Sequence, residues 1–371
     1  MRVLHIVTGL ASGGAERQLQ LLLRHLPAHQ HCEVAALTNP GTVAAALRAE
    51  GVTVHHLAMR GNRDVGALPR LVRLVRAGRY DVVHTHLFRA QLYGRLAARL
   101  AGVRAVVSTE HSLHAGVIEG RPVTRGVKGL YLAAERLGTT TVAVSRQVAQ
   151  TLHSWGVPPA RVELIPNGID TARHHRADAD RAATRARMRA GLGLPPDGWV
   201  IGGVGRLVPG KRFDVLLEAL AGLDRAARLV LVGDGPERAA LERRAVELGV
   251  RDRLVLTGER DDVPDLLTAL DVLAAPSTEE TFGLGVLEGL AAGLPVRHSA
   301  CPALDELPPS AAPQARRIPS DAAAYTTALR ELRHLNDHST DPLPRPPAVG
   351  HYDIARVAAD LGALYDRLAR A

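Results

Sequence analysis

Short apolar runs alternate with longer amphipathic stretches along most of the chain. In the first half, apolar runs predict buried strands at residues 3–7, 33–37, 52–57, 82–85, 105–108, 141–144 and 162–165. Between these runs, apolar positions recur every three or four residues, as in the helix predicted at residues 15–26, where Leu19, Leu22 and Leu23 share one face. Strands separated by helices indicate βαβ units and a parallel sheet.

The pattern stops near residue 171 and then starts again. Residues 171–190, TARHHRADADRAATRARMRA, have no strand pattern and predict a connector with a solvated helix. Strands are predicted again at 200–204, 229–232, 254–257, 272–275 and 294–298, helices at 212–220, 236–248, 263–270 and 284–292, a loop at 336–350 and a final amphipathic helix at 353–370. We therefore expect two Rossmann-like α/β domains in tandem, with ligands bound in a cleft between them at the carboxyl ends of the strands.

The composition is consistent with two domains, and its positive net charge raises the question of a polyanionic partner. The chain has 371 residues, 46% of them hydrophobic, which is enough for two cores. A net charge of +8 would suit a polyanionic partner, but Lys128 and Lys211 are the only lysines, and the remaining basic residues are arginine. Such a skew indicates a GC-rich coding sequence rather than a basic patch. Because aromatic residues make up only 3%, no base-stacking platform is expected, and we expect no nucleic-acid partner.

The cysteines and the apolar segments indicate the cellular compartment of the protein. Cys32 and Cys301 lie far apart and form neither a disulfide framework nor a zinc-binding spacing. The amino-terminal apolar run is too short for the apolar region of a signal peptide, and no run approaches the length of a transmembrane helix. We therefore expect a cytoplasmic protein.

A basic amphipathic stretch at residues 68–80 leaves open a peripheral contact with the inner face of the membrane. Arg70, Arg73 and Arg76 fall on one side of the predicted helix, and Leu71 and Val75 fall on another. A solvated helix that packs on its own sheet is the favoured alternative.

The segment PSTEETFGLGVLEGLAAGLPV, residues 276–296, carries the strongest chemical signal. Glu280 falls in the loop that follows a predicted strand, and Glu288 falls about one turn into the next helix. A helix start attracts phosphate, Gly283 lets the backbone approach an anion, and carboxylates accept hydrogen bonds from sugar hydroxyls. The segment therefore predicts places for a diphosphate, a ribose and a sugar. The alternative is a pair of ordinary acidic residues near a helix start.

Two further loops follow predicted strands. In GVGRLVPGKRFDVLLEAL, residues 203–220, Arg206 and Lys211 flank a Pro-Gly turn and can converge on one diphosphate. Two solvated cations are the alternative, although cations at a helix start are electrostatically disfavoured. In TGLASGGAERQLQLLL, residues 8–23, Gly13 and Gly14 allow close approach of a ligand, although the spacing is not a dinucleotide fingerprint and a plain βα turn is the alternative.

Three histidines and two aspartates are the candidate metal ligands. His84 and His86 end one predicted strand and His111 follows the next. We expect one of His84 and His86 to line an acceptor pocket and the other to be structural. The three histidines have no evident supporting partners, and Asp178 and Asp180 follow no predicted strand, so we expect no metal site.

These motifs together resemble a known family. The run from Glu280-Thr-Phe-Gly to Glu288, followed by AAGLPV, resembles the E-x7-E signature of the retaining glycosyltransferases of family 4, which have the GT-B fold. The resemblance implies that Glu280 contacts the donor sugar, that Glu288 binds the ribose of the nucleotide, and that Arg206 and Lys211 hold the donor diphosphate without a metal.

The resemblance also assigns the remaining candidates. Gly13 and Gly14 match a GG-x-E loop that faces the donor phosphate and the acceptor, and His111 matches a histidine that contacts the donor sugar. Arg260 lies where the nucleotide base is expected. The implied catalytic residues are Arg206, Lys211, Glu280 and His111, and the implied donor-binding residues are Gly13, Gly14, Arg206, Lys211, Arg260, Glu280, Phe282, Gly283, Leu284 and Glu288.

The implied activity is transfer of a hexose from a nucleotide-diphosphate sugar to a hydroxyl of a glycan, a lipid-linked or a small-molecule acceptor, as in polysaccharide biosynthesis. Retention would follow from attack on the leaving-group side, with no metal and no cofactor. The implied parts are an acceptor-side domain (1–172), a connector (173–197), a nucleotide-sugar-binding domain (198–350) and a helix (351–371) that crosses back to the first domain. A nucleotide-sugar epimerase, a sugar phosphorylase and, less favoured, a polyanion-binding protein remain alternatives.

One segment departs from the family pattern. After Gly293-Leu-Pro-Val the family continues through small residues to a Gly-Gly turn and a glutamate. Here the chain continues as RHSACPALDELP, residues 297–308, with no glycine pair. We therefore expect a different local backbone beside the site.

Overall fold

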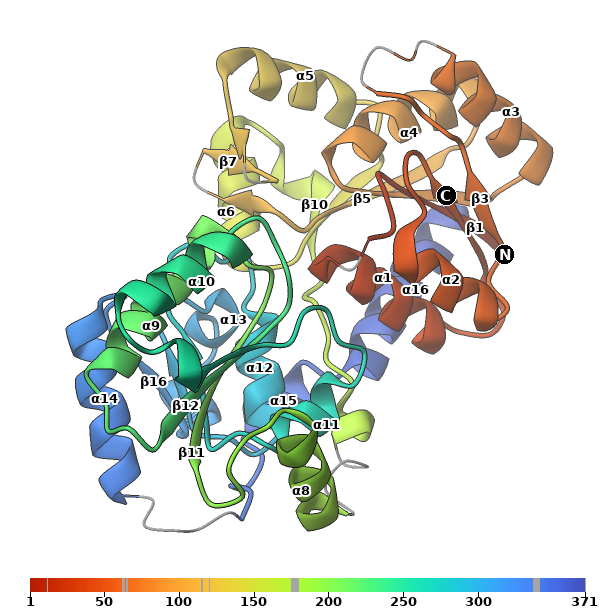
Figure 1. Cartoon of the computed structure of the whole chain (residues 1–371). Helices are drawn as coiled ribbons and strands as arrows, with labels where there is room; N and C mark the ends of the chain where they lie inside the picture. The colour runs from red at the N-terminus through yellow and green to blue at the C-terminus, as the bar shows by residue number, and fades with distance from the viewer. Residues whose placement is uncertain are drawn as a thin grey trace. The chain divides into compact units, whose positions relative to one another are not determined.

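A computed structural model describes the chain except residues 12, 62, 63, 65, 115, 120, 175–179, 336–340 and 371 and the side chain of His114. It divides the chain into two compact units (Figure 1): Met1–Gly168 with Ile354–Ala371, and Ile169–Asp353. Each unit contains a parallel sheet with helices on both faces, so the predicted pair of Rossmann-like α/β domains is confirmed. The second unit includes the described part of the expected connector, whereas Asp178 lies outside the described residues.

The first unit is built on a seven-stranded sheet in the order β10-β9-β5-β4-β1-β2-β3, and every neighbouring pair is parallel. Its strands are mostly apolar and buried, as expected for a sheet covered on both faces. Their bounds are β1 (Arg2–Val7), β2 (His31–Ala36), β3 (Val54–His56), β4 (Val82–His86), β5 (Ala105–Glu110), β9 (Thr140–Ala143) and β10 (Val162–Leu164).

The helices of this unit divide between the two faces according to the alternation of side chains along β1. Val3 and Val7 pack towards α1, α2 and α16, whereas Leu4 and Ile6 pack towards α3 and α4. The helices are α1 (Gly14–His25), α2 (Gly41–Ala49), α3 (Ala67–Gly78), α4 (Phe88–Ala101), α5 (Arg125–Glu135), α6 (Arg146–Trp155) and α16 (Ile354–Arg370), with a 3-10 turn η1 (Pro159–Arg161).

The basic amphipathic stretch is α3, and its apolar side lies in the core. Leu71 and Val75 are buried against the sheet and α4. Arg70 pairs with Asp64, and Arg76 donates to the carbonyl of Leu100. The stretch therefore packs on its own sheet. No helix in the described part of the chain is both long and apolar enough to span a membrane.

The second unit is built on a six-stranded parallel sheet in the order β13-β12-β11-β14-β15-β16. The order reverses between β11 and β14, which is the position where open α/β sheets bind ligands. The strands are β11 (Trp199–Val204), β12 (Ala227–Val232), β13 (Leu254–Leu256), β14 (Val272–Ala275), β15 (Val296–His298) and β16 (Ala315–Arg317).

Helices also cover both faces of the second sheet. One core joins the sheet to α9, α10 and α14, and α11 and α12 lie against the other face, where Gly202 and Gly289 give space to Leu270 and Leu273. The elements are α8 (Arg181–Gly191), η2 (Pro209–Lys211), α9 (Phe213–Ala221), α10 (Arg238–Glu247), η3 (Arg251–Arg253), α11 (Val263–Leu267), α12 (Leu284–Ala291), α13 (Pro302–Asp305), η4 (Pro309–Ala311), α14 (Ala322–Leu335) and α15 (Pro347–His351).

Helix α8 differs from the solvated helix predicted there. Arg189 is buried, and both Arg185 and Arg189 pair with Asp271, the residue before β14, at 2.5 and 2.9 Å. Their guanidinium groups also donate to backbone carbonyls at residues 268–270. The arginine-rich sequence therefore anchors this helix to the sheet.

A small antiparallel sheet in the first unit was not predicted. It consists of β6 (Leu113–His114), β7 (Val117–Ile118) and β8 (Arg121–Pro122), which follow His111 in the chain. Strands of two residues give no periodic signal, which explains why the sequence pattern missed them.

Candidate functional site

Lys211 and Glu280 form an ion pair at the carboxyl edge of the second sheet. Lys211 ends the 3-10 turn that follows β11, and Glu280 lies in the loop that follows β14. Gly205 makes the turn compact, because a Cβ there would lie 3.3 Å from Cε of Lys211 in a left-handed backbone conformation, φ 149°. The two motifs singled out in the sequence therefore meet.

Hydrogen bonds hold the two loops together. The buried Ser277 hydroxyl donates to the carbonyl of Gly210 at 3.0 Å, and the backbone N–H of Thr278 donates to the same oxygen at 3.2 Å. A Cβ at Gly210 would lie 2.9 Å from a carboxylate oxygen of Glu279. The position of Glu280 relative to Lys211 is thus fixed by the backbone of both loops.

A small hollow of about 20 Å³ lies at this junction. Its lining contains three of the predicted site residues, Lys211, Glu280 and Gly283, together with Gly285 at the start of α12. Arg206 lies in the same β11 loop. It is exposed, and within the described residues no ion pair is recorded for it. Its guanidinium is therefore available to an anion.

The start of α12 depends on close contact with the segment that departs from the family pattern. Gly283 has φ 103°, and a Cβ there would lie 2.5 Å from Sγ of the buried Cys301. Ala303 donates its backbone N–H to the carbonyl of Phe282 at 3.0 Å. Residues 301–303 therefore support the turn that aims the first N–H groups of α12, including those of Leu284 and Gly285, along the helix axis.

Phe282 and Glu288, two predicted residues of this segment, lie in different surroundings. The ring of Phe282 is buried and packs edge-on against Tyr352, with centroids 5.1 Å apart. Glu288 is the fifth residue of α12, beyond its first turn, and is partly exposed. Phe282 thus acts through packing, and Glu288 lies one turn away from Gly283.

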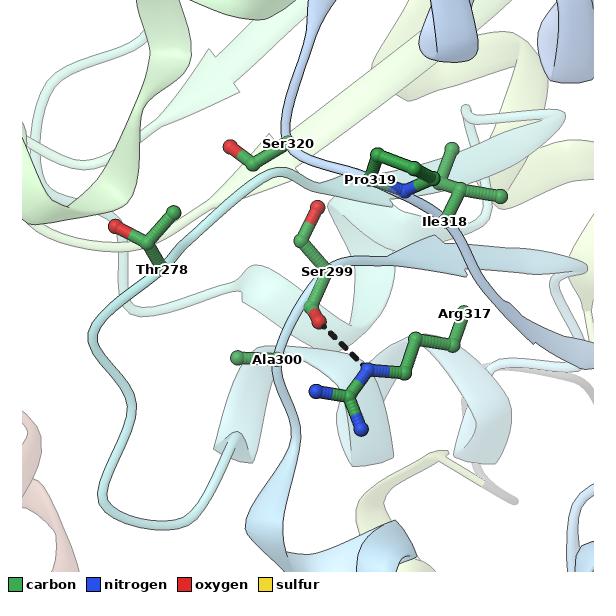
Figure 2. A pocket seen from close by; sticks show the side chains of 7 residues that line it. All are labelled: Thr278, Ser299, Ala300, Arg317, Ile318, Pro319 and Ser320. Carbon is green, nitrogen blue, oxygen red and sulfur yellow. Dashed lines mark hydrogen bonds between the residues drawn. The ribbon is translucent and has the colours of Figure 1, made fainter.

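A larger hollow of about 490 Å³ lies beyond the loop that carries Glu280 (Figure 2). Thr278, Ser299, Arg317 and Ser320 line it, and none of the predicted site residues does. Figure 2 shows the Arg317 guanidinium bonded to the carbonyl of Ser299 at 3.1 Å. Because Arg317 also pairs with Asp305, its charge is already balanced. The smaller hollow, which contains Lys211 and Glu280, is therefore the better candidate for binding a phosphorylated sugar.

Arg260, the residue expected to bind the nucleotide base, already has a partner in the structure. The Arg260 guanidinium makes two hydrogen bonds to Asp262, at 2.7 and 2.5 Å. These bonds raise the pKa of Arg260 and hold its plane in one orientation.

The remaining candidates lie in the first unit and are described there alone. Gly13 precedes α1, and a Cβ on it would lie 2.3 Å from a carboxylate oxygen of Glu16. Gly14 begins the helix and has open space on its Cβ side. The glutamate of the GG-x-E loop therefore folds back over the first glycine.

His111 lies at the end of a group of buried histidines. Its Nε2 is 3.1 Å from Nδ1 of His86, and Nε2 of His86 is 3.0 Å from Nδ1 of His5. His84 bonds the hydroxyls of Tyr365 and Thr109, at 2.5 and 2.7 Å. Burial lowers the pKa of His111 to about 4 and that of His5 to about 3, so both rings are neutral near pH 7. Neither His84 nor His86 lines an exposed acceptor pocket, because both are buried.

Within the described residues, His5, His84 and His86 offer nitrogen atoms that lie within 4.8 Å of one another, which is close enough to share a metal ion. Both nitrogens of His84 are already taken by hydroxyl groups. Three-ligand coordination would therefore have to break one of these hydrogen bonds.

The sequence analysis missed His5, Ser277 and Cys301. His5 lies inside the apolar run of β1. Its place beside the other histidines becomes visible only from the parallel pairing of β1 with β4, in which His5 is opposite His84. Ser277 directly precedes the predicted loop residues, and Cys301 gave no signal beyond its place in the divergent segment.

Comparisons with known proteins connect both units to sugar transfer. Residues 12–173 match the sequence model of Glycosyltransferase Family 4, and residues 198–334 match that of Glycosyl transferases group 1. The D-inositol 3-phosphate glycosyltransferase of Salinispora arenicola is 36% identical over 243 residues, 59% of this chain and 53% of the relative. The 2-deoxystreptamine glucosyltransferase of Streptomyces kanamyceticus is 35% identical over 62% of each chain. The chain thus spans about half to three fifths of the length of these relatives.

Solved structures extend the likeness to the whole fold. The crystal structure of Anabaena HepE in complex with UDP-glucose aligns with a TM-score of 0.84 and 19% identity, covering 99% of this chain and 100% of that one. WaaG, a glycosyltransferase involved in lipopolysaccharide biosynthesis, aligns with a TM-score of 0.71 and 20% identity over 99% of this chain and 98% of that one. These alignments confirm the predicted GT-B fold.

Proposed function

The chain belongs to glycosyltransferase family 4, and from that premise we propose that it transfers a hexose, with retention, from a nucleotide-diphosphate sugar to an acceptor hydroxyl. The observation that carries the proposal is the meeting of Lys211 and Glu280 in one hollow at the carboxyl edge of a Rossmann-like sheet. A nucleotide-diphosphate sugar carries a diphosphate next to a hexose. A binding site for it needs a cation for the phosphate, here Lys211, beside a carboxylate for the sugar hydroxyls, here Glu280.

Lys211 and Arg206 hold the donor diphosphate in this proposal. The ammonium group of Lys211 has three donors, so it can bond Glu280 and a phosphate oxygen together. Arg206 adds a planar guanidinium from the same loop, and the N–H groups at the start of α12 face the same hollow through Gly283 and Gly285.

The sugar and the nucleoside are assigned to neighbouring groups. Glu280 accepts hydrogen bonds from the donor hexose, and His111 contacts the same sugar. Glu288, one turn into α12, binds the ribose hydroxyls. Arg260 offers the face of its guanidinium, held by Asp262, to the base.

The chemical step exchanges one bond at the anomeric carbon. The bond from that carbon to the diphosphate oxygen breaks, and its electron pair leaves with the diphosphate. The acceptor oxygen bonds to the same face of the carbon, and its proton passes to the departing phosphate oxygen. Arg206 and Lys211 stabilise the leaving charge, so we propose that no metal or other cofactor is required.

The acceptor is a hydroxyl-bearing glycan, lipid-linked glycan or small molecule. Relatives of the chain are named for an inositol phosphate, an aminocyclitol and a diphosphoundecaprenol-linked sugar, which have only a hydroxyl group in common. The apolar side of α3 is buried, so contact with a lipid-linked acceptor at a membrane would use another surface. We propose a cytoplasmic location, where Cys32 and Cys301 remain as free thiols.

A thermal-shift panel tests donor binding. The purified chain is heated with UDP-, GDP-, ADP- and TDP-sugars in the presence of EDTA. A ligand at about one hundred times its dissociation constant stabilises the folded state by about 2.7 kcal/mol, which raises the melting temperature by several degrees. A shift with one nucleotide class supports the proposal, and no shift with any class refutes it.

A further inference from the structure

The larger hollow at the carboxyl edge of the second sheet has a lining that differs from that of the proposed donor site. Loops that follow three neighbouring strands, β14, β15 and β16, surround its space of about 490 Å³ (Figure 2). Open α/β sheets bind ligands at this edge, and ligand pockets have volumes of roughly 300–1,000 Å³. The hollow therefore has the position and the size of a binding site for a small molecule or for one unit of a larger one.

Hydrogen bonds between the three loops fix the walls of this hollow. The backbone N–H of Ser299 donates to the carbonyl at the end of β14 at 3.0 Å, and that of Ile318 donates to the carbonyl at the end of β15 at 2.9 Å. The Ser320 hydroxyl donates to the carbonyl of Pro276 at 2.5 Å, which ties the loop after β16 to the loop after β14. Because the walls are already joined, a ligand needs to order little of the protein when it binds.

The polar groups of the lining keep part of their hydrogen-bonding capacity. Arg317 donates through Nε to the carbonyl of Ser299 and through Nη1 to Asp305, which uses two of the five N–H donors of a guanidinium. The Ser320 hydroxyl donates once, so its oxygen can still accept. Thr278 adds a further hydroxyl from the loop after β14. The hollow therefore offers donors and acceptors from all three loops.

The lining carries no net charge. Among the described residues that line the hollow, only Arg317 is charged, and its ion pair with Asp305 balances that charge. Ala300, Ile318 and Pro319 add apolar surface beside the hydroxyl groups. A phosphate or a carboxylate would find no spare cation here. A neutral sugar, which carries hydroxyl groups on a ring of C–H groups, matches this mixture of polar and apolar surface.

The two hollows of the second unit share one loop. Ser277 and Glu280 of the loop after β14 line the smaller hollow, and Thr278 of the same loop lines the larger one. A sugar in the larger hollow would therefore lie next to the loop whose Glu280 is proposed to hold the donor hexose.

We propose that the larger hollow binds a neutral sugar residue of the acceptor, so that the chain acts on glycan acceptors. The binding of a sugar stands on the hollow alone, whereas its use as an acceptor subsite rests on the proposed function. Ser299 and Ala300 belong to the segment 297–308 that departs from the family pattern. The subsite is therefore a feature of this chain and not one that the resemblance implies.

Methyl NMR of the full chain tests the binding of a sugar. Ile318 lines the hollow, and its δ1 methyl signal is assigned by comparison with Ile318→Val. Ile6, in the core of the first unit, is the reference signal. The probes are the methyl glycosides of glucose, galactose, mannose and N-acetylglucosamine. We expect at least one of them to shift the Ile318 signal in a saturable way and to leave the Ile6 signal unchanged.

Two neighbouring arginines of β16 provide a matched pair of variants. Arg317→Met removes the N–H donors of the hollow and should weaken binding about tenfold, as expected for the loss of a hydrogen bond to a charged group. Arg316→Met removes an exposed cation that pairs with Glu331 instead, and should bind the sugar like the wild type. Ala300→Phe should abolish binding, because the ring fills the hollow.

Three results would overturn the proposed sugar site. The first is an Ile318 signal that no probe shifts. The second is equal binding by Arg317→Met and Arg316→Met, or binding that persists in a folded Ala300→Phe variant. The third is a saturable shift that is larger with inorganic phosphate than with any of the sugars, because Arg317 would then serve an anion.

Transfer assays test the role of the subsite in the reaction. The donor selected by the thermal-shift panel is supplied with the glycoside that binds. Arg317→Met should lower transfer to the glycoside relative to transfer to water about tenfold, and Arg316→Met should leave this ratio unchanged. An unchanged ratio in Arg317→Met would overturn the acceptor role. Sugar binding at Ile318 without any turnover of donor would count against the proposed function and leave the sugar site intact.

Discussion

Lys211 and Glu280 are ion-paired although they lie 69 positions apart in the chain. The pair is partly buried, with 26% and 14% of the two side chains exposed. The carbonyl of Gly210, next to Lys211, accepts hydrogen bonds from the Ser277 hydroxyl and the Thr278 N–H, which ties the Glu280 loop to the Lys211 loop. This geometry brings the phosphate-binding and sugar-binding candidates of the second unit together.

Replacing Lys211 tests its role in stabilising the leaving group. Lys211→Met should lower kcat by about 100-fold, as expected for loss of one preorganised donor to a developing charge, with a smaller change in donor KM. Steady-state kinetics measure both constants. The matched control is Lys128→Met, the other lysine of the chain, which lies over the ring of Trp155 in the first unit and should leave kcat unchanged. Equal kcat values for the two variants would contradict the assignment.

Glu288 is assigned to the ribose, so its loss should weaken donor binding more than turnover. Glu288→Gln keeps the shape of the side chain and should raise the donor dissociation constant about tenfold, the loss of a hydrogen bond to a charged group. Calorimetric titration measures the change. Glu331→Gln removes an exposed carboxylate paired with Arg316 in the same unit and should bind donor like the wild type. The assignment fails if Glu288→Gln also binds normally.

Gly283 should be intolerant of a side chain for two physical reasons. Its φ of 103° is strained for other residues, and a Cβ would lie 2.5 Å from Sγ of Cys301. Gly283→Ala should therefore cost about 2–5 kcal/mol of stability, seen as a lower melting temperature.

Two variants control that experiment. Adding Cys301→Ala should recover part of the loss, because the sulfur is removed. Gly14→Ala, which places a Cβ in open space on a helix, should be neutral or stabilising by up to about 1 kcal/mol. Similar melting temperatures for Gly283→Ala and Gly14→Ala would show that the turn before α12 is not constrained.

Some of this arrangement could be predicted from the sequence and some could not. Strands such as β4 and β14 were predictable because parallel strands buried on both faces are continuous apolar runs. Strand β16 was missed because Ala315–Arg317 is an edge strand with two exposed arginines. The candidates Lys211 and Glu280 follow from loop positions after strands, but their pairing depends on the order in which β11 and β14 join the sheet. His5 was invisible because an imidazole inside an apolar run gives no periodic signal.

The buried histidines also predict a pH dependence of stability. The folded pKa is lowered to about 3 for His5 and about 4 for His111, below the unfolded value near 6.5. Between these values the unfolded chain binds more protons than the folded one, so stability falls as the pH drops below about 6.5. Each such histidine contributes up to about 1.4 kcal/mol per pH unit.

Urea unfolding at pH 7, 6 and 5 measures this slope. In a Trp199→Phe background, Trp155 is the only tryptophan and reports on the first unit. His5→Phe should reduce the slope between pH 6 and 5 by about the contribution of one histidine. Identical slopes with and without His5 would show that its ring is not held neutral in the folded state.

The most direct test of hexosyl transfer with retention follows the anomeric proton by NMR. The chain is incubated in EDTA with the α-linked nucleotide sugar selected by the thermal-shift panel, and water serves as the acceptor when no other is added. The account predicts release of nucleoside diphosphate with the α-anomer of the sugar formed first, and a much slower reaction in Lys211→Met. First formation of the β-anomer, or a reaction that requires a divalent metal, would contradict it.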